Sequence, residues 1–198
     1  MKALLIDYGS GNLRSAAKAL EAAGFSVAVS KDPRAARGAD LLVLPGQGHF
    51  GQVMRAFRAS GFLEEVLGHL ERGLPFLGIC VGMQILYQAS EEALDEGGLG
   101  LFEGRVLRFQ KGRVPQMGWN RVWFEGAFEE LSGAFFYYAN SYYGPLTPYS
   151  LGKSEYEGTV YTALLARENL LAPQFHPEKS GRAGLAFLRL VLRHFQVL

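Results

Sequence analysis

The sequence contains little cysteine, no long apolar run and almost no net charge, and each shortage excludes a class of protein. Cys80 is the only cysteine among 198 residues, so no disulfide can form within the chain and we expect a reducing, cytoplasmic setting. No stretch approaches the roughly 20 apolar residues of a membrane-spanning helix. The run MKALLIDYG is too short for a signal peptide and is interrupted by Asp7. A net charge of +1 gives no electrostatic reason to bind nucleic acid or an anionic membrane.

Alternating apolar and amphipathic segments in the first half of the chain indicate an α/β fold. Near-continuous apolar stretches at 2–7, 25–30, 40–46 and 74–80 are predicted strands. Helical patterns occupy 13–24, 50–73 (broken near Ser60-Gly61) and 81–90. Because buried strands that alternate with helices form parallel sheets, we expect a mostly parallel central sheet with helices on both faces.

The pattern changes from about residue 103. Predicted strands joined by turns follow at 104–109, 120–125, 135–143 and 162–175, before an amphipathic helix at 184–198. No linker, internal repeat or low-complexity tract separates these segments. The sequence therefore predicts a single domain over residues 1–198, with an inserted antiparallel segment.

The lone cysteine lies in Gly78-Ile79-Cys80-Val81-Gly82, where a predicted strand meets a predicted helix. The nucleophile elbow G-x-S-x-G has the same layout, with a strained turn that exposes the reactive atom. Free amides at a helix N-terminus favour a thiolate, and the amide of Val81 is placed to bind an oxyanion. Lone buried cysteines are often inert core residues, but this context favours a nucleophile.

A thiol nucleophile needs a base, and the chain has four histidines. His69 and His194 lie in predicted amphipathic helices and are expected to be solvated, while His49 follows a Pro-Gly turn and is a weaker candidate. His176 directly follows a predicted strand, in QFHPE. In extended chain, residues i and i+2 point the same way, so Glu178 can orient the imidazole of His176. These residues and the cysteine form a candidate Cys-His-Glu triad.

With these residues identified, the chain resembles the class I glutamine amidotransferases, whose elbow and HPE signatures match GICVG and FHPEKS. More narrowly, it is similar to the glutaminase subunits of imidazole glycerol phosphate synthases, from histidine biosynthesis. The matching segments follow the family order along essentially the whole chain: DYGSGNLRS (7–15), LPGQGHF (44–50), GICVGMQILYQASEE (78–92), VPQMGWN (114–120), NSYY (140–143) and FHPEKS (175–180). The first and fourth discriminate among class I glutaminases.

The resemblance implies glutamine hydrolysis without a cofactor or metal, and a heterodimer with a (β/α)₈-barrel cyclase subunit that receives the ammonia. By resemblance, Cys80 is the nucleophile, His176 the base and Glu178 its orienting group. The other implied site residues are the oxyanion-hole amides of Gln47 and Val81, the substrate ligands Gly48, Gln84, Glu92, Ser141 and Tyr142, and the partner-facing residues Asn12, Met117, Trp119 and Lys179.

The family couples hydrolysis to acceptor binding in the partner, and the Pro45–Gly48 turn is the expected gate. An oxyanion hole needs two amides, and glycine tolerates backbone conformations closed to other residues. A flip of the Gly46-Gln47 peptide can therefore present either a carbonyl or an amide to the site. This predicts slow hydrolysis by the isolated chain.

Three positions depart from the family pattern: Gln47 stands where valine is usual, and Gln116 and Asn140 stand where histidine is usual. A backbone-amide role at Gln47 is unaffected, whereas the side-chain roles at the other two positions stay open. Two alternatives also stay open. One is a glutaminase that serves another synthase, such as the pyridoxal phosphate one, and the other is a non-catalytic α/β protein with a structural cysteine.

Overall fold

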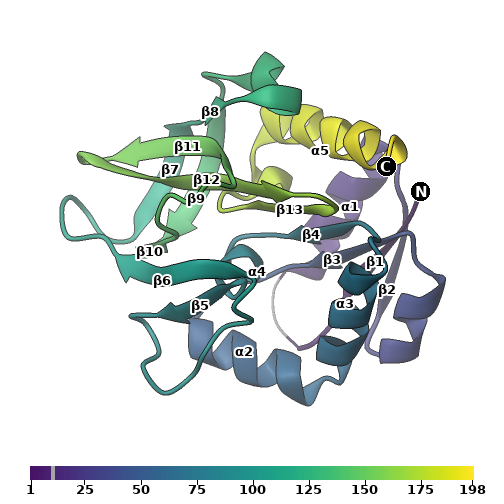
Figure 1. The fold of residues 1–198 in the computed structure, drawn as a ribbon. Coiled ribbons are helices and arrows are strands. Elements are labelled where there is room, and N and C mark those ends of the chain that lie inside the picture. Colours follow the sequence, from purple (N-terminus) through teal and green to yellow (C-terminus); the bar gives the residue numbers. More distant parts are fainter. Residues whose placement is uncertain (10–11) are drawn as a thin grey trace.

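An eight-stranded sheet, in the order β2-β1-β3-β4-β13-β12-β11-β8, forms the centre of the computed structural model, which describes residues 1–9 and 12–198 (Figure 1). Ser10 and Gly11 of the predicted DYGSGNLRS loop lie outside the described residues. Five neighbouring strands are parallel: β2 (Ser26–Ser30), β1 (Lys2–Ile6), β3 (Leu41–Leu44), β4 (Phe76–Gly78) and β13 (Leu170–Pro173). The antiparallel strands β12 (Thr159–Arg167), β11 (Ser150–Tyr156) and β8 (Trp123–Phe124) complete the sheet.

Helices cover both faces of this sheet. The contacting helices α1 (Leu13–Ala23) and α5 (Gly181–Gln196) lie on one face, and α2 (Phe50–Ala59) and α3 (Phe62–Glu71) lie on the other (Figure 1). The break between α2 and α3 falls at Gly61, whose φ of +81° suits glycine. The short 3₁₀ helices are η1 (Pro33–Gly38), η2 (Gly126–Leu131) and η3 (Pro177–Lys179). The predicted fold, a mostly parallel sheet covered on both faces, is confirmed.

Part of the predicted antiparallel insertion forms two smaller sheets, and the rest joins the central sheet as β8, β11 and β12. Strands β7 (Gln116–Arg121) and β9 (Phe135–Asn140) form an antiparallel pair, and β5 (Tyr87–Ser90), β6 (Phe102–Arg108) and β10 (Tyr142–Tyr143) form a three-stranded sheet. Strand β11 was not predicted, because its sequence SLGKSEY is largely polar and only alternate residues are buried.

The prediction of a helix over 81–90 is wrong. Helix α4 covers only Val81–Gln84, and the chain then enters β5. The carbonyls of Ile85 and Leu86 accept hydrogen bonds from the amides of Leu99 and Leu101, 2.7 and 2.9 Å away. Since these partners come from a distant loop, they replace the intrahelical bonds that would continue the helix.

The predictions that His69 and His194 are solvated are also wrong. His69 is fully buried with its Nε2 2.9 Å from the carbonyl oxygen of Pro75, and burial lowers its pKa. His194 is half-buried beside the ring of Phe128, and burial again lowers its pKa. Neither lines the cavity that contains Cys80.

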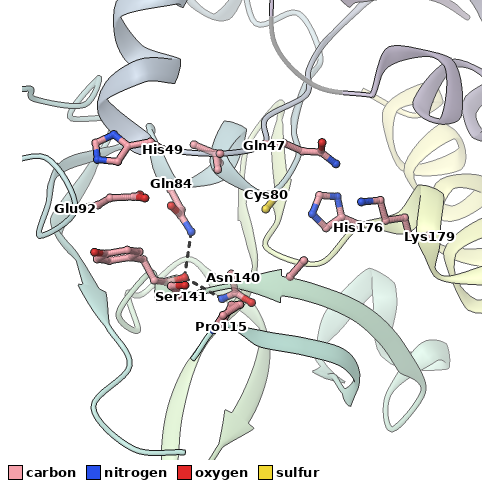
Figure 2. A pocket seen from close by; sticks show the side chains of 14 residues that line it. Gln47, His49, Cys80, Gln84, Glu92, Pro115, Asn140, Ser141, His176 and Lys179 are labelled. Atoms are coloured by element: carbon pink, nitrogen blue, oxygen red, sulfur yellow. Dashed lines mark hydrogen bonds between the residues drawn. The ribbon is translucent and has the colours of Figure 1, made fainter. Parts of the chain in front are cut away.

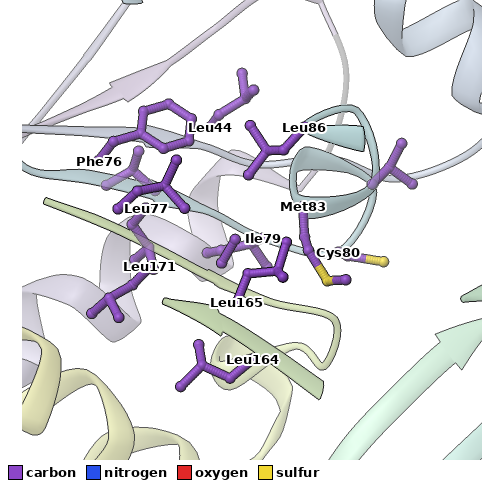
Figure 3. Close-up of a cluster of buried hydrophobic side chains, with 14 of the residues drawn as sticks. Leu44, Phe76, Leu77, Ile79, Cys80, Met83, Leu86, Leu164, Leu165 and Leu171 are labelled. Atoms are coloured by element: carbon purple, nitrogen blue, oxygen red, sulfur yellow. The ribbon is translucent and has the colours of Figure 1, made fainter. Parts of the chain in front are cut away.

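Buried aliphatic and aromatic side chains from the central strands form a cluster against which Cys80 and α4 rest (Figure 3). The cluster includes Leu44, Phe76, Leu77, Ile79, Met83, Leu86, Leu164, Leu165 and Leu171. Close packing of this kind resists displacement, so it holds the cysteine-bearing turn in one place. Within residues 1–9 and 12–198, none of the helices combines the length and the apolar character needed to cross a bilayer.

Candidate active site

The candidate site forms where three neighbouring parallel strands end. Strands β3, β4 and β13 are adjacent in the sheet, so their carboxyl ends meet at one edge, where open α/β sheets bind ligands. Strand β3 leads into the turn 45–48, β4 leads to Cys80, and β13 leads to the segment 174–178. Sheet order thus brings together segments that are far apart in the sequence.

Cys80 has the strained backbone of a nucleophile elbow. Its φ of 55° and ψ of −110° are unusual for a residue with a side chain and typically cost about 1–3 kcal/mol. The amide of Cys80 donates to the carbonyl of Pro173 over 2.9 Å. A Cβ added at Gly78 would lie 2.6 Å from the carbonyl oxygen of Gly82. A Cβ added at Gly82 would lie 2.3 Å from the carbonyl oxygen of Leu44. The glycines of G-x-C-x-G are therefore required by close backbone approach.

His176 and Glu178 form a buried pair. Nδ1 of His176 lies 2.6 Å from Oε1 of Glu178, and their side chains are 3% and 6% exposed. The two residues are not in extended chain as predicted, because Pro177 begins η3 and the Lys179 amide donates to the His176 carbonyl. The side chains still meet, but across a turn rather than along a strand.

The pKa of His176 is strongly raised. Burial alone would lower it, but the charge of Cys80, a hydrogen bond to the Cys80 side chain and the Glu178 carboxylate outweigh burial and raise the pKa to about 10. The imidazole is therefore cationic at neutral pH. A cationic imidazole can protonate a leaving group that departs from the sulfur-bound carbon.

A cavity of about 520 Å³ opens above the cysteine and histidine (Figure 2). Both side chains reach it, whereas Glu178 lies behind His176 and does not line it. The other predicted residues that line the cavity are Gln47, Gly48, Val81, Gln84, Glu92, Ser141, Tyr142 and Lys179. Its remaining walls are His49, Pro115, Ala139 and Asn140. Of these, His49 does not contact the triad, and its Nδ1 instead accepts from the Gly51 amide at the start of α2.

Gln84 and Glu92 line the cavity, and hydrogen bonds hold both side chains in place. Gln84 donates Nε2 to the Tyr142 carbonyl (3.1 Å) and to Gln174 (3.0 Å), and its buried Oε1 has no partner among the described residues. Oε2 of Glu92 accepts from the Phe50 amide over 3.0 Å. The carboxylate of Glu92 in the cavity wall suits the ammonium group of an amino acid.

Three of the four predicted partner-facing residues lie outside the cavity. Met117 and Trp119 on β7 are 67% and 56% exposed, and Asn12 is an exposed N-cap whose Oδ1 accepts from the Ser15 amide. The fourth, Lys179, lines the cavity. Exposed large apolar side chains on one strand are typical of a docking surface.

The open positions 116 and 140 form one polar pair. Gln116 donates Nε2 to Oδ1 of Asn140 over 3.2 Å, and Asn140 donates to the Tyr142 carbonyl over 2.8 Å. That carbonyl also accepts from Gln84, so the pair supports the cavity wall. Gln174, which contacts both Cys80 and Gln84, was not predicted as a site residue. Its only signal was its place in QFHPE, two residues before His176.

Among the described residues, no group of three or more histidine, cysteine, aspartate or glutamate side chains is arranged to hold a metal ion. The site offers the chemistry of a cysteine side chain beside a cationic, carboxylate-oriented imidazole. The catalytic and binding roles of the individual residues stay predictions at this point.

Comparisons with known proteins agree with the resemblance. A family model described as "Glutamine amidotransferase class-I" matches residues 4–194. The chain is 77% identical over 198 residues to a Thermus thermophilus protein named imidazole glycerol phosphate synthase subunit HisH, with 100% of both chains covered. It is 49% identical over 193 residues to the Deinococcus radiodurans protein of the same name, with 93% of this chain and 90% of the relative covered.

Solved structures support the fold. A glutamine amidotransferase crystal structure matches with a TM-score of 0.75 at 23% identity, covering 95% of this chain and 98% of the other. PurLQS from Thermotoga maritima matches with a TM-score of 0.73 at 22% identity, covering 98% of each chain. Because the family model spans nearly all of the sequence and the relatives are matched end to end, the chain belongs to the class I glutamine amidotransferase family.

Proposed function

We propose that this chain is the glutaminase subunit of an imidazole glycerol phosphate synthase, and that it hydrolyses glutamine to glutamate and ammonia. The observation that carries the proposal is the 77% identity to the Thermus thermophilus subunit over the full length of both chains. The cavity at Cys80 supports it, since its volume of about 520 Å³ falls within the usual range for small-molecule sites.

In the proposed first step, the thiolate of Cys80 attacks the side-chain carbonyl carbon of glutamine. Gln47 and Val81 line the cavity, and their backbone amides would bind the resulting oxyanion. As the tetrahedral intermediate collapses, cationic His176 donates its proton to the amide nitrogen, the carbon–nitrogen bond breaks and ammonia leaves. The product on the enzyme is a thioester.

In the second step, neutral His176 removes a proton from water, and the hydroxide attacks the thioester carbonyl. The carbon–sulfur bond breaks, glutamate leaves, and the thiolate and imidazolium are restored. Glu178 keeps the ring oriented through its 2.6 Å contact with Nδ1, so that Nε2 carries the transferred proton in both steps. Gln84, Glu92, Gly48, Ser141 and Tyr142 would hold the rest of the substrate.

The proposed partner is the (β/α)₈-barrel cyclase subunit, which uses the ammonia to form imidazole glycerol phosphate. A second groove, of about 620 Å³, lies along β7 and is lined in part by Met117 and Trp119. Pro115 borders both this groove and the active-site cavity. A partner seated on these exposed residues would therefore cover a surface continuous with the site, and ammonia could pass without protonation in bulk water.

The test is glutamine hydrolysis and imidazole glycerol phosphate formation by the chain with and without a purified cyclase. Cys80→Ala should abolish glutamine-dependent synthesis and leave synthesis from added ammonia unchanged, because only ammonia production requires the thiol. Full glutamine hydrolysis by Cys80→Ala would refute the nucleophile assignment. Binding to a pyridoxal phosphate synthase barrel in place of the cyclase would favour the alternative glutaminase.

A further inference from the structure

Gln174 is a fully buried amide that reaches the reactive sulfur from inside the protein. It is 0% exposed, and its backbone amide donates to the Ala163 carbonyl over 2.9 Å. Its side-chain Nε2 lies 3.6 Å from Sγ of Cys80, within hydrogen-bonding range for sulfur. The cavity is lined by its neighbours and not by Gln174 itself.

The other end of the same amide is also occupied. Oε1 of Gln174 accepts from Nε2 of Gln84 over 3.0 Å, which leaves Oε1 of Gln84 without a partner among the described residues. A buried glutamine whose donor and acceptor are both used is held in one orientation. One side chain therefore connects the nucleophile to a predicted substrate ligand.

We propose that Gln174 is a positioning residue that donates a hydrogen bond to the Cys80 thiolate and, through Gln84, aligns the substrate with it. A donor to the charged sulfur favours the thiolate over the thiol. The imidazole of His176 must turn from the sulfur to protonate the departing amide nitrogen, whereas Gln174 takes no part in proton transfer and can hold the sulfur throughout. This positioning role rests on the proposed glutaminase function. The contact between Gln174 and the sulfur can nevertheless be tested without glutamine.

The charged and titratable groups around Cys80 are few. His176 contacts it directly, with Glu178 behind the imidazole, while Lys179, His49 and Glu92 lie around the cavity. None of them changes in a Gln174 variant. A change in thiolate reactivity would therefore report on the amide.

The experiment measures the rate of alkylation by iodoacetamide against pH in Gln174→Met and Gln174→Glu. Since Cys80 is the only cysteine, alkylation reports on this thiol alone. Gln174→Met removes both hydrogen bonds and keeps a side chain of similar length. Gln174→Glu keeps an acceptor for Gln84 but replaces the amide donor with a carboxyl group. Gln174→Met should move the midpoint of the alkylation profile to higher pH by about one unit, and Gln174→Glu should move it further once the carboxyl ionises.

Steady-state glutaminase kinetics with the cyclase provide the second readout. We expect kcat to fall at least about tenfold in both variants, in line with loss of a hydrogen bond to a charged group. Matched substitutions at exposed Gln52 on α2 should leave both readouts unchanged. Thermal melting identifies a variant that does not fold, in which case Gln174→Asn, which withdraws the amide by one methylene, should shift the midpoint in the same direction.

An unchanged alkylation profile in Gln174→Met, with only KM raised, would mean that Gln174 merely supports Gln84 and would overturn the proposal. A wild-type chain that alkylates as expected but does not hydrolyse glutamine would overturn the proposed function instead. The two failures are therefore distinguishable.

Discussion

Oε1 of the Glu178 carboxylate lies 2.6 Å from Nδ1 of His176, whereas Oε2 is buried and has no partner among the described residues. A buried carboxylate with an unused oxygen is costly unless a positive charge compensates for it. The cationic imidazole provides that charge. The pair is therefore electrostatically coupled, and changes at one residue should appear at the other.

Glu178→Gln should lower kcat by about 10- to 100-fold, a smaller loss than His176→Ala causes. The amide is close to the carboxylate in size and can still accept a hydrogen bond from Nδ1, but it no longer stabilises the imidazolium by charge. Kinetics with saturating glutamine and liganded cyclase provide the measurement. Equal losses in the two variants would show that the carboxylate does more than orient the ring.

Protonation of His176 should stabilise the fold in a defined pH window. Its pKa is raised from 6.5 to about 10 in the folded protein, so the folded state binds the proton more tightly than the unfolded state does. The stabilisation is complete below pH 6.5 and is lost as pH rises toward about 10. Urea unfolding of the wild type and His176→Asn between these values should show a difference that shrinks with rising pH.

Cys80→Ala is the control for this window. It removes the charge and the hydrogen bond that raise the pKa of His176, so the stabilisation should be smaller and its loss should be complete at a lower pH. A wild-type difference that does not vary with pH would contradict the pKa assignment.

Trp119→Ala should weaken cyclase binding by about 2 kcal/mol or more, the scale of aromatic hot spots. The indole is 56% exposed and contacts the ring of Tyr137 only edge-on, so the isolated chain should stay folded. Trp123→Ala on β8 is the matched control, because that side chain is 53% exposed but lies outside the β7 groove. Titration calorimetry should find normal affinity for the control. Equal losses in the two variants would remove the case for docking on β7.

The turn before α2 should control activation by the partner. We expect slow glutamine turnover by the isolated chain and strong stimulation by liganded cyclase. Gly46 cannot be substituted as a probe, because an added Cβ would lie 2.4 Å from the Gly82 amide nitrogen. Gly48 has space for a methyl group but a φ of +97°, so Gly48→Ala restrains the backbone without a clash.

Gly48→Ala should therefore reduce the stimulation by cyclase more than it reduces basal turnover. Gly158→Ala, which has φ +84° and equal space in a different turn, controls for backbone strain alone. Isolated-chain turnover that already matches the liganded complex would exclude gating by this turn and leave the cysteine chemistry intact.

Local patterns in the sequence were sufficient to predict much of this protein. Alternating apolar strands and amphipathic helices predict the layers of the fold, because the apolar faces of these elements must be buried against one another. The spacing Gly78-x-Cys80-x-Gly82 predicts a close strand–helix junction. Glycine is needed at both positions, because an added Cβ would lie only 2.3 to 2.6 Å from a neighbouring backbone oxygen. Such features depend on residues adjacent in the sequence, and they could be read without a structure.

Features that depend on distant partners were decided by the tertiary structure alone. The loop amides of Leu99 and Leu101 end the helix that the sequence predicted to continue from Gln84. The order β3-β4-β13 places Gln174 against Cys80 across 94 positions of sequence. Sheet order and loop packing are set by the combined burial of the whole chain, and no short segment carries that information.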